Sequence, residues 1–453
     1  MNRAWPFVIA SQATPKETEN TRGLVIIGGT LIALTAAAAF AFKTWGDNGF
    51  IALAAPAALL VLLATRLAER AATMRALWLI FGVALALRVV AISFEPLLST
   101  DIYRYVWDGK VQAAGANPYR YVPADPALAS LRDTAIFPHI NRADYALTIY
   151  PPVAQAFFLL VTRLGANTLV MRLALLACEA VTVLVVLRLL KRLRLPPTRI
   201  VAYLWHPLPV WEIANNGHID GLMVCLMVLG IWLAIGGRAI RGAVVVALAS
   251  LAKPLALPAL AVIWRPWNWK MILAVIATIA LCYAPYLSVG WNVFGFLTKG
   301  YLVEEGVSTG SGLWLLDLWR LAFGAHRGDV AAYIVFAASL MMAGSVWIWS
   351  RPQRNEVADL AGINSLLLAG LVLLSPNYPW YFLALVPFLP LCGNAPTWAA
   401  TIGAILLTDE VETDFQIPTM IVKSVLFGAI FLSVVWSMRR KAAMPAISQE
   451  SAP

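Results

Sequence analysis

Long apolar runs recur along almost the whole chain, and they constrain its fold more than any other feature. A helix needs about 20 apolar residues to cross a bilayer, and shorter runs suffice inside a bundle. Of the 453 residues, 60% are hydrophobic and 13% are charged, about half the charge of an average soluble domain. We therefore expect an all-α polytopic membrane protein with about 12 transmembrane helices. The predicted spans are residues 24–43, 49–65, 75–94, 168–190, 199–214, 219–235, 270–289, 329–349, 358–374, 379–393, 396–408 and 418–437.

Two further apolar stretches, residues 149–165 and 242–264, contain prolines or charges in their interior. A full crossing by either one would place basic clusters on the wrong side of the membrane. We expect both stretches to be interfacial or re-entrant, because irregular backbone at membrane depth is tolerated where protein buries it.

Basic side chains collect on one side of this alternation of spans, and most acidic side chains collect on the other. Because short cytoplasmic loops are enriched in lysine and arginine, we expect both chain ends to lie in the cytoplasm of a bacterial inner membrane protein. The formal net charge of +10 then arises mainly from basic cytoplasmic loops, which set the topology and contact anionic lipid. It does not imply a nucleic-acid partner.

The predicted organisation is a single membrane domain over residues 1–453. It has a first outer loop at 95–167, a second outer loop at 290–328, and a cytoplasmic tail at 438–453. The sequence contains no Gly-rich phosphate-binding loop of the kind that holds a nucleotide-activated substrate. An activated group used at the outer membrane face therefore has to arrive on a lipid. The four cysteines have no CxxC spacing and the histidines have no HExxH spacing, so we expect no cofactor and no metal.

The stretch "LSTDIYRYVWDGKVQAAGANPYRY" at 98–121 places acids, bases and aromatic rings directly after a span. If a helix starts at Asp101, then Asp101, Arg104, Tyr105 and Asp108 share one face. A carboxylate near the hydrocarbon boundary is partly desolvated and can act as a general base, which makes Asp101 the candidate. The aromatic rings suit the apolar face of a sugar, and they equally suit an interfacial belt.

If the activated group leaves its lipid carrier as an anion, that leaving group needs a nearby cation. His218 is a strong candidate because "NNGHIDG" places it beside Asp220, whose carboxylate can orient and charge the imidazole; a helix cap is the structural alternative. Three charges inside or between apolar segments are expected to face the bundle interior, namely Arg88, Glu179 and Lys253, and the structural interpretation is an ion pair of Arg88 with Glu179. The outer-face cation candidates are Arg104, Arg120, His139, Arg142, His218 and Lys299.

Three segments carry a resemblance to a known family. The first is "STDIYRYVWDGKVQAAGANPYRYVPADP" followed by "LTIYPPVAQAFF", and the others are "HPLPVWEIANNGHIDGLM" and "LLSPNYPWYFLALVPF". Together they resemble bacterial polyprenyl-phosphate-dependent mannosyltransferases of the C-type membrane glycosyltransferase superfamily (GT-C). The resemblance implies transfer of a hexose, expected to be mannose, from a polyprenyl-phosphate carrier to an acceptor hydroxyl, with inversion and without a metal.

The resemblance further implies that Asp101 is the catalytic base. The expected partners are membrane lipid, the polyprenyl-phosphate sugar, and a glycan or glycolipid acceptor. The residues that we assign to donor phosphate and sugar binding are Arg104, Tyr105, Trp107, Asp108, Tyr119, Arg120, Tyr150, His218, Asp220, Trp380 and Tyr381.

Two alternatives stay open on the sequence. A secondary transporter or flippase of lipid-linked saccharide also has many spans and buried charges, although it more often shows paired halves with corresponding broken helices. A glycan ligase or polymerase shares the large outer loop, but it is expected to use a lipid-diphosphate donor. The fate of a labelled lipid-phosphate sugar distinguishes these classes.

Overall fold

The computed structural model describes residues 15–264, 268–294, 300, 302–304, 306–351, 355–407 and 419–443, and the regular elements within these ranges are helices. Seven of the helices are long and apolar enough to cross a membrane, or up to eight if one bent pair forms a span. The predicted all-α membrane class is therefore confirmed, whereas the count of about 12 spans stays a prediction.

The α-helices of the described chain are α1 (Pro15–Arg70), α2 (Met74–Ile92), α3 (Asp101–Ala113), α4 (Pro152–Leu164), α5 (Thr168–Arg192), α6 (Val201–Leu204), α7 (Asp220–Ile235), α8 (Ala239–Ser250), α9 (Leu257–Ile263), α10 (Trp269–Tyr283), α11 (Leu302–Glu304), α12 (Trp314–Phe323), α13 (Asp329–Trp349), α14 (Glu356–Leu374), α15 (Phe388–Cys392), α16 (Ala395–Gly403) and α17 (Thr419–Ala443). Short 3₁₀ segments are η1 (Pro126–Leu131), η2 (Phe137–His139), η3 (Pro197–Ile200), η5 (Pro254–Ala256), η6 (Ala284–Phe294), η8 (Pro379–Leu385) and η9 (Ala404–Leu407), and η4 (Pro209–Asn215) is a π-helix.

The segment α1 accounts for two of the predicted spans, because it consists of two helices joined at a sharp kink. Gly46 interrupts it with φ +59°, a left-handed conformation that glycine adopts without steric cost. The two halves fold back on each other, because a Cβ at Gly23 would lie 2.8 Å from a side-chain carbon of Leu67. Predicted spans 24–43 and 49–65 thus form one helical hairpin.

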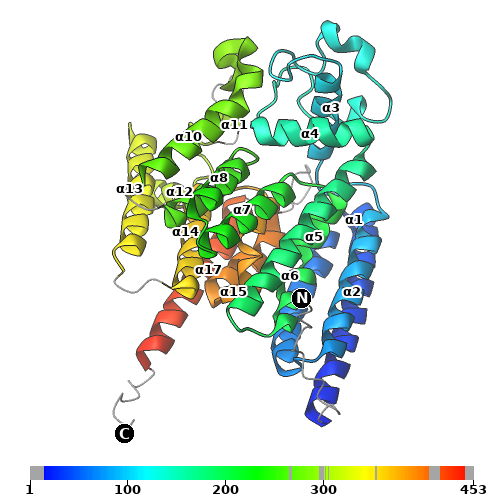
Figure 1. Cartoon of the computed structure of the whole chain (residues 1–453), viewed down its shortest axis with the longest axis vertical. Coiled ribbons are helices and arrows are strands. Elements are labelled where there is room, and N and C mark those ends of the chain that lie inside the picture. Colours follow the sequence, from blue (N-terminus) through cyan, green and yellow to red (C-terminus); the bar gives the residue numbers. More distant parts are fainter. Residues whose placement is uncertain are drawn as a thin grey trace, which may run out of the picture.

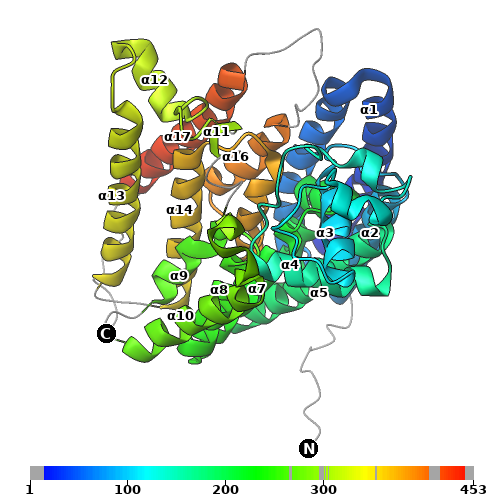
Figure 2. The same cartoon turned by 90° about the horizontal axis from the view of Figure 1, so that it is seen from above.

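The bundle has two distinct ends. Helices α3 and α4 lie at the top of Figure 1, and we call this the upper end. The turns between other helices meet at the lower end, where Arg192 pairs with Glu356 at 2.6 Å and donates to the carbonyl of Ile235. Viewed from above, α3 and α4 lie over the side that holds α2 and α5, away from α12 and α13 (Figure 2).

Residues 242–264 form a hairpin that starts and ends toward the lower end. Helix α8 packs antiparallel to α7, since a Cβ at Gly230 would lie 2.8 Å from the carbonyl of Gly242, while Lys253 pairs with Asp220 at the upper end of α7. Helix α9 then returns, and its Ala261 carbonyl accepts from the indole of Trp349 at the lower end of α13. This geometry agrees with the re-entrant interpretation of the stretch.

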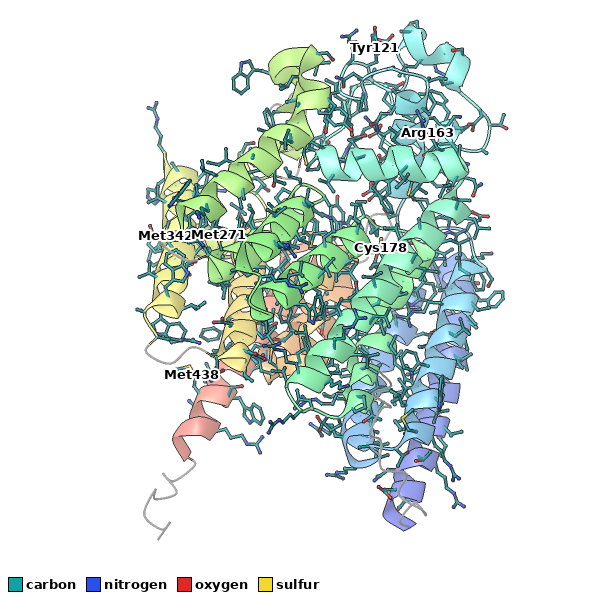
Figure 3. All side chains as sticks on the ribbon, viewed as in Figure 1. Tyr121, Arg163, Cys178, Met271, Met342 and Met438 are labelled. Carbon is teal, nitrogen blue, oxygen red and sulfur yellow. The ribbon has the colours of Figure 1, made fainter. Side chains whose placement is uncertain are left out.

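The segment 149–165 forms α4, which lies across the upper ends of the longer helices (Figure 1). It crosses α3 at close range, because a Cβ on Gly109 would lie 2.5 Å from the Phe158 carbonyl. Figure 3 shows Tyr121 and Arg163 in this upper layer and Cys178 lower down on α5. The layer holds the first predicted outer loop together and positions the start of α3.

A buried ion pair links three parts of the bundle. The guanidinium of Arg88 in α2 lies 2.6 Å from Glu179 in α5, and it also donates to the Leu204 carbonyl in α6. Less than a tenth of either side chain is exposed. The predicted interior ion pair is confirmed, and it satisfies two charges that would be costly to bury alone.

Candidate active site

A cavity of about 100 Å³ opens at the upper end, where the first loop meets the broken helices. Its wall combines one carboxylate, several cations and a group of aromatic rings. The lining residues that matter below are Asp101, Arg104, Asn141, Arg142, Tyr150, Lys253, Tyr378, Trp380 and Tyr381.

Asp101 is the first residue of α3, and its backbone N–H donates to the hydroxyl of Ser99 at 3.3 Å, whereas the N-cap residue Thr100 makes no side-chain cap hydrogen bond. Two asparagines fix the loop segment that precedes Asp101. The side chain of Asn215 accepts from the backbone of Leu97, and that of Asn216 accepts from the backbones of Leu97 and Leu98. The "NNGH" motif therefore holds the segment that carries Asp101.

The structure also brings His218 close to Asp101, a contact that the sequence did not predict. Pro209 begins the π-helix η4, the chain bends by 116° between η4 and α7, and Gly217 in the bend has φ +68°. A Cβ on Gly217 would lie 2.5 Å from Ile102, so α3 and this bend can approach only with glycine there. The bend places His218 Nδ1 3.9 Å from Asp101 Oδ2.

Aromatic rings from a distant segment complete this wall. The ring of Trp380 stacks on His218 with a centroid distance of 4.0 Å, and Tyr378 stacks on the other side of the indole at 4.5 Å. The segment "PWY" at the start of η8 thus reaches the bend before α7. Flat aromatic rings of this kind pack well on the apolar face of a sugar.

Lys253 supplies a cation to the cavity. Its Nζ donates to Asp220 Oδ2 at 2.7 Å and lies 4.2 Å from the centroid of Tyr381. Asp220 is fully buried at the first residue of α7, whereas Lys253 is 17% exposed and faces the cavity. Because an ammonium group has three donors, one bond to Asp220 leaves capacity for an anion in the cavity.

The electrostatics of Asp101 suit a general base. Burial raises the pKa of Asp101 above its usual range, and this effect exceeds the opposing influence of Lys253 and Arg142 and of hydrogen bonds from Tyr150 and Asn141. A quarter of the side chain is nevertheless exposed toward the cavity. The carboxylate is therefore both accessible and more basic than an ordinary aspartate.

Asp108 lies beneath the cavity and holds its floor together. Its two oxygens accept from Arg104 at 2.8 Å, from Thr148 at 2.5 Å and from Gln155 at 2.8 Å. Arg104 in turn donates to the Ala146 carbonyl and lines the cavity. Asp108 therefore positions Arg104 and does not itself line the cavity.

Asp108→Asn is expected to lower the free energy of unfolding by about 1–3 kcal/mol, because buried Arg104 loses its charged partner. The measurement is thermal unfolding of the detergent-purified protein. Asp144→Asn, at an exposed position of the same loop, should leave the unfolding midpoint unchanged. Equal midpoints for both variants would contradict the role of Asp108.

The remaining predicted binding residues divide into two groups. Tyr150, Trp380 and Tyr381 line the cavity, and their assignment to substrate binding stays a prediction. Tyr105, Trp107, Tyr119 and Arg120 do not line it, so a direct contact with substrate is not supported for them. Tyr105 packs on Phe158, Trp107 on Phe137, Tyr119 donates to the Tyr150 carbonyl at 2.6 Å, and Arg120 is exposed.

The outer-face cation candidates also differ in whether they line the cavity. Arg142 lines the cavity and pairs with Glu304 of the second loop at 2.8 Å. His139 is exposed and stacks on Tyr103, outside the cavity wall. Lys299 lies outside the residues that the structure describes.

Sequence reasoning missed Lys253 as a member of this site, as well as Asn141 and Tyr378. Lys253 was expected only to face the interior, and no local pattern connects it with Asp220, which lies 33 positions earlier. Its placement before Pro254 in an otherwise apolar stretch is the one signal that marks it.

Two comparisons with known proteins found a similarity over the part of the chain that builds this site. The family model described as "Alpha-(1->6)-mannopyranosyltransferase, N-terminal domain" matches residues 48–269, a range that includes Asp101, His218, Asp220 and Lys253. Alpha-(1->6)-mannopyranosyltransferase A of Mycobacterium tuberculosis is 25% identical over 344 residues, which are 68% of this chain. The match spans 63% of that relative's length. No solved structure matches the chain significantly. Over these ranges the chain is thus similar to alpha-(1->6)-mannopyranosyltransferases.

Proposed function

We propose that this protein transfers mannose, with inversion, from a polyprenyl-phosphate carrier to the hydroxyl of a glycan or glycolipid at the outer membrane face. The observation that carries the proposal is the presence of the basic carboxylate Asp101 and the cation Lys253 in one cavity. An inverting transfer needs these two groups, one for the acceptor and one for the leaving phosphate.

The proposed reaction uses the cavity as follows. Asp101 takes the proton of the acceptor hydroxyl while the hydroxyl oxygen attacks the anomeric carbon. The bond from that carbon to the phosphate oxygen breaks, and its electron pair leaves with the lipid phosphate. Lys253 and Arg142 stabilise the charge that grows on the phosphate, while Trp380 and Tyr381 hold the sugar. We propose that no metal takes part.

The position of the cavity favours a lipid-borne donor. It lies at the upper end of the bundle, beside α7 and the α8–α9 turn, where a lipid headgroup at the membrane surface reaches Lys253. Nothing in the sequence indicates a nucleotide-phosphate loop. A carrier lipid can present its phosphate there and leave its chain in the bilayer.

The stereochemistry of the donor tests the proposal. The relative's name specifies an alpha product, so an inverting enzyme that makes the same product must consume a β-linked mannosyl phosphate. With synthetic α- and β-mannosyl phosphate lipids offered separately, we expect only the β-linked lipid to be consumed. Consumption of the α-linked lipid with an alpha-linked product would show retention and would overturn the mechanism.

The orientation of the site in the membrane is testable separately. Cysteines that replace exposed Ala114 at the upper end and exposed Lys191 at the lower end should differ in reactivity toward an impermeant thiol reagent. In intact cells we expect Ala114→Cys to be labelled and Lys191→Cys to be protected until the cells are lysed. The reverse pattern would place the cavity in the cytoplasm.

A further inference from the structure

Glu212 is a buried carboxylate that the proposed reaction does not use. It lies in the π-helix η4 with 2% of its side chain exposed. Its Oε2 accepts from the amide of Asn216 at 3.1 Å and lies 3.3 Å from His218 Nε2. On the other side of the imidazole, Nδ1 lies 3.9 Å from Asp101 Oδ2. The ring of His218 therefore lies between a deeply buried carboxylate and the carboxylate of the cavity.

The surrounding structure fixes the orientation of this ring. The backbone N–H of His218 donates to the Glu212 carbonyl at 2.8 Å, and Trp380 covers one ring face. The side chain is fully buried, and neither ring nitrogen makes a hydrogen bond of standard geometry to another side chain. The ring can therefore change its proton positions without changing its place.

The charges around His218 determine which nitrogen carries the proton. A proton on Nε2 is favoured by the carboxylate oxygen of Glu212, the nearest anionic atom to that nitrogen. The lone pair of Nδ1 then faces Asp101. The charged side chains that approach the ring or the adjoining bend are Asp101 from α3, Arg172 from α5, Glu212 from η4, Asp220 from α7 and Lys253 before η5.

We propose, on the basis of the function above, that Glu212 is a positioning residue that holds His218 in its Nε2–H tautomer. In this form the lone pair of Nδ1 faces Asp101 Oδ2 and favours the protonated form of that carboxyl, so Asp101 takes the proton of the acceptor hydroxyl more readily. His218 itself stays neutral, because burial and the charge of Lys253 lower the pKa of His218 well below its ordinary value. The proton then leaves Asp101 to water in the cavity.

Glu212→Gln separates this role from a structural one. A glutamine keeps the volume and still accepts from Asn216, so the loop that carries Asp101 stays in place. It removes the negative charge from the oxygen that faces Nε2, which weakens the preference for a proton on Nε2 and raises the population of the Nδ1–H tautomer. We expect kcat to fall by about 10- to 100-fold while KM for the lipid donor stays within about twofold. The acid limb of the pH profile should move to lower pH, because Nδ1–H then stabilises ionised Asp101. Wild-type kcat and an unchanged profile would overturn the proposal.

A double-mutant cycle tests whether Glu212 acts through His218. If it does, Glu212→Gln should cause little further loss of kcat in a His218→Gln background, so that the two effects are strongly non-additive. Losses that add independently would show that Glu212 contributes by another route, and they would contradict its positioning role.

A spectroscopic measurement keeps this inference separate from the transferase activity. The chain has four histidines, and with isotope-labelled imidazoles the signal of His218 is identified by its loss in His218→Gln. At neutral pH we expect the Nε2–H tautomer in the wild type and a shift toward Nδ1–H in Glu212→Gln. If no donor is consumed but these tautomers are seen, only the proposed reaction fails. If mannose is transferred but wild-type His218 shows Nδ1–H, the positioning role of Glu212 fails.

Discussion

Asp101→Asn should reduce mannosyl transfer by about 10²–10⁴-fold, the range that a general base contributes, while the protein remains folded in the membrane. The amide keeps the volume of the carboxylate and its place at the start of α3, but it cannot take the acceptor proton. The measurement is the initial rate of label transfer from polyprenyl-phosphate mannose by equal amounts of purified wild type and variant.

Two controls define this result. Asp144→Asn removes an exposed carboxylate of the same loop outside the cavity wall, and its rate should equal that of the wild type. Because burial raises the pKa of Asp101, the wild-type rate should fall on acidification at a pH above the ordinary aspartate range. A rate in Asp101→Asn close to that of the wild type would remove Asp101 from the role of base.

Removal of the Lys253 charge should cause the second largest decrease in mannosyl transfer. Lys253→Met alone leaves Asp220 buried without its partner, which can itself cost about 3–5 kcal/mol of folding free energy. The informative variant is therefore Lys253→Met with Asp220→Asn, in which the buried charge is also removed. We expect kcat to fall by about 10²–10³-fold, the cost of removing one donor to a developing oxyanion.

Lys253→Arg keeps a cation beside Asp220 and should retain more activity than the double variant. Arg120→Gln removes an exposed cation outside the cavity wall and should have no effect on the rate. If the double variant is folded and transfers mannose at the wild-type rate, the leaving phosphate does not depend on Lys253.

The helical bundle was predictable because the composition of each segment determines whether that segment forms a membrane-spanning helix. Each apolar run has to satisfy its own backbone hydrogen bonds in lipid, so span length and composition indicate helices directly. The hairpin at Gly46 and the re-entrant turn at Lys253 agree with the predicted runs for the same reason. Exact helix boundaries are less predictable, since prolines such as Pro209 divide a span into pieces too short to recognise by hydropathy.

The candidate site was predictable only in part. Asp101 and His218 lie in polar motifs that interrupt apolar sequence, and the structure brings them together. Periodicity placed Asp108 on the same face as Asp101, but α4 covers the lower part of that face and buries the carboxylate. Lys253 reaches Asp220 only through the packing of α7 on α8, which no local pattern reveals.

Aromatic residues were the least predictable members of the site. Trp107 and Trp380 both lie close to tyrosines in segments next to a predicted span, and no local pattern separates them. In the folded chain, Trp107 packs under the loop against Phe137, whereas Trp380 stacks on His218 and lines the cavity. The difference arises from tertiary packing alone.

The choice of donor tests the central claim most directly. Purified wild-type protein in lipid is given a membrane glycolipid extract with either radiolabelled polyprenyl-phosphate mannose or radiolabelled nucleotide-activated mannose, and label in the acceptor is measured. We predict transfer from the lipid phosphate and none from the nucleotide. Transfer from the nucleotide alone would contradict the proposed donor, and labelled lipid that only changes leaflets would instead identify a transporter.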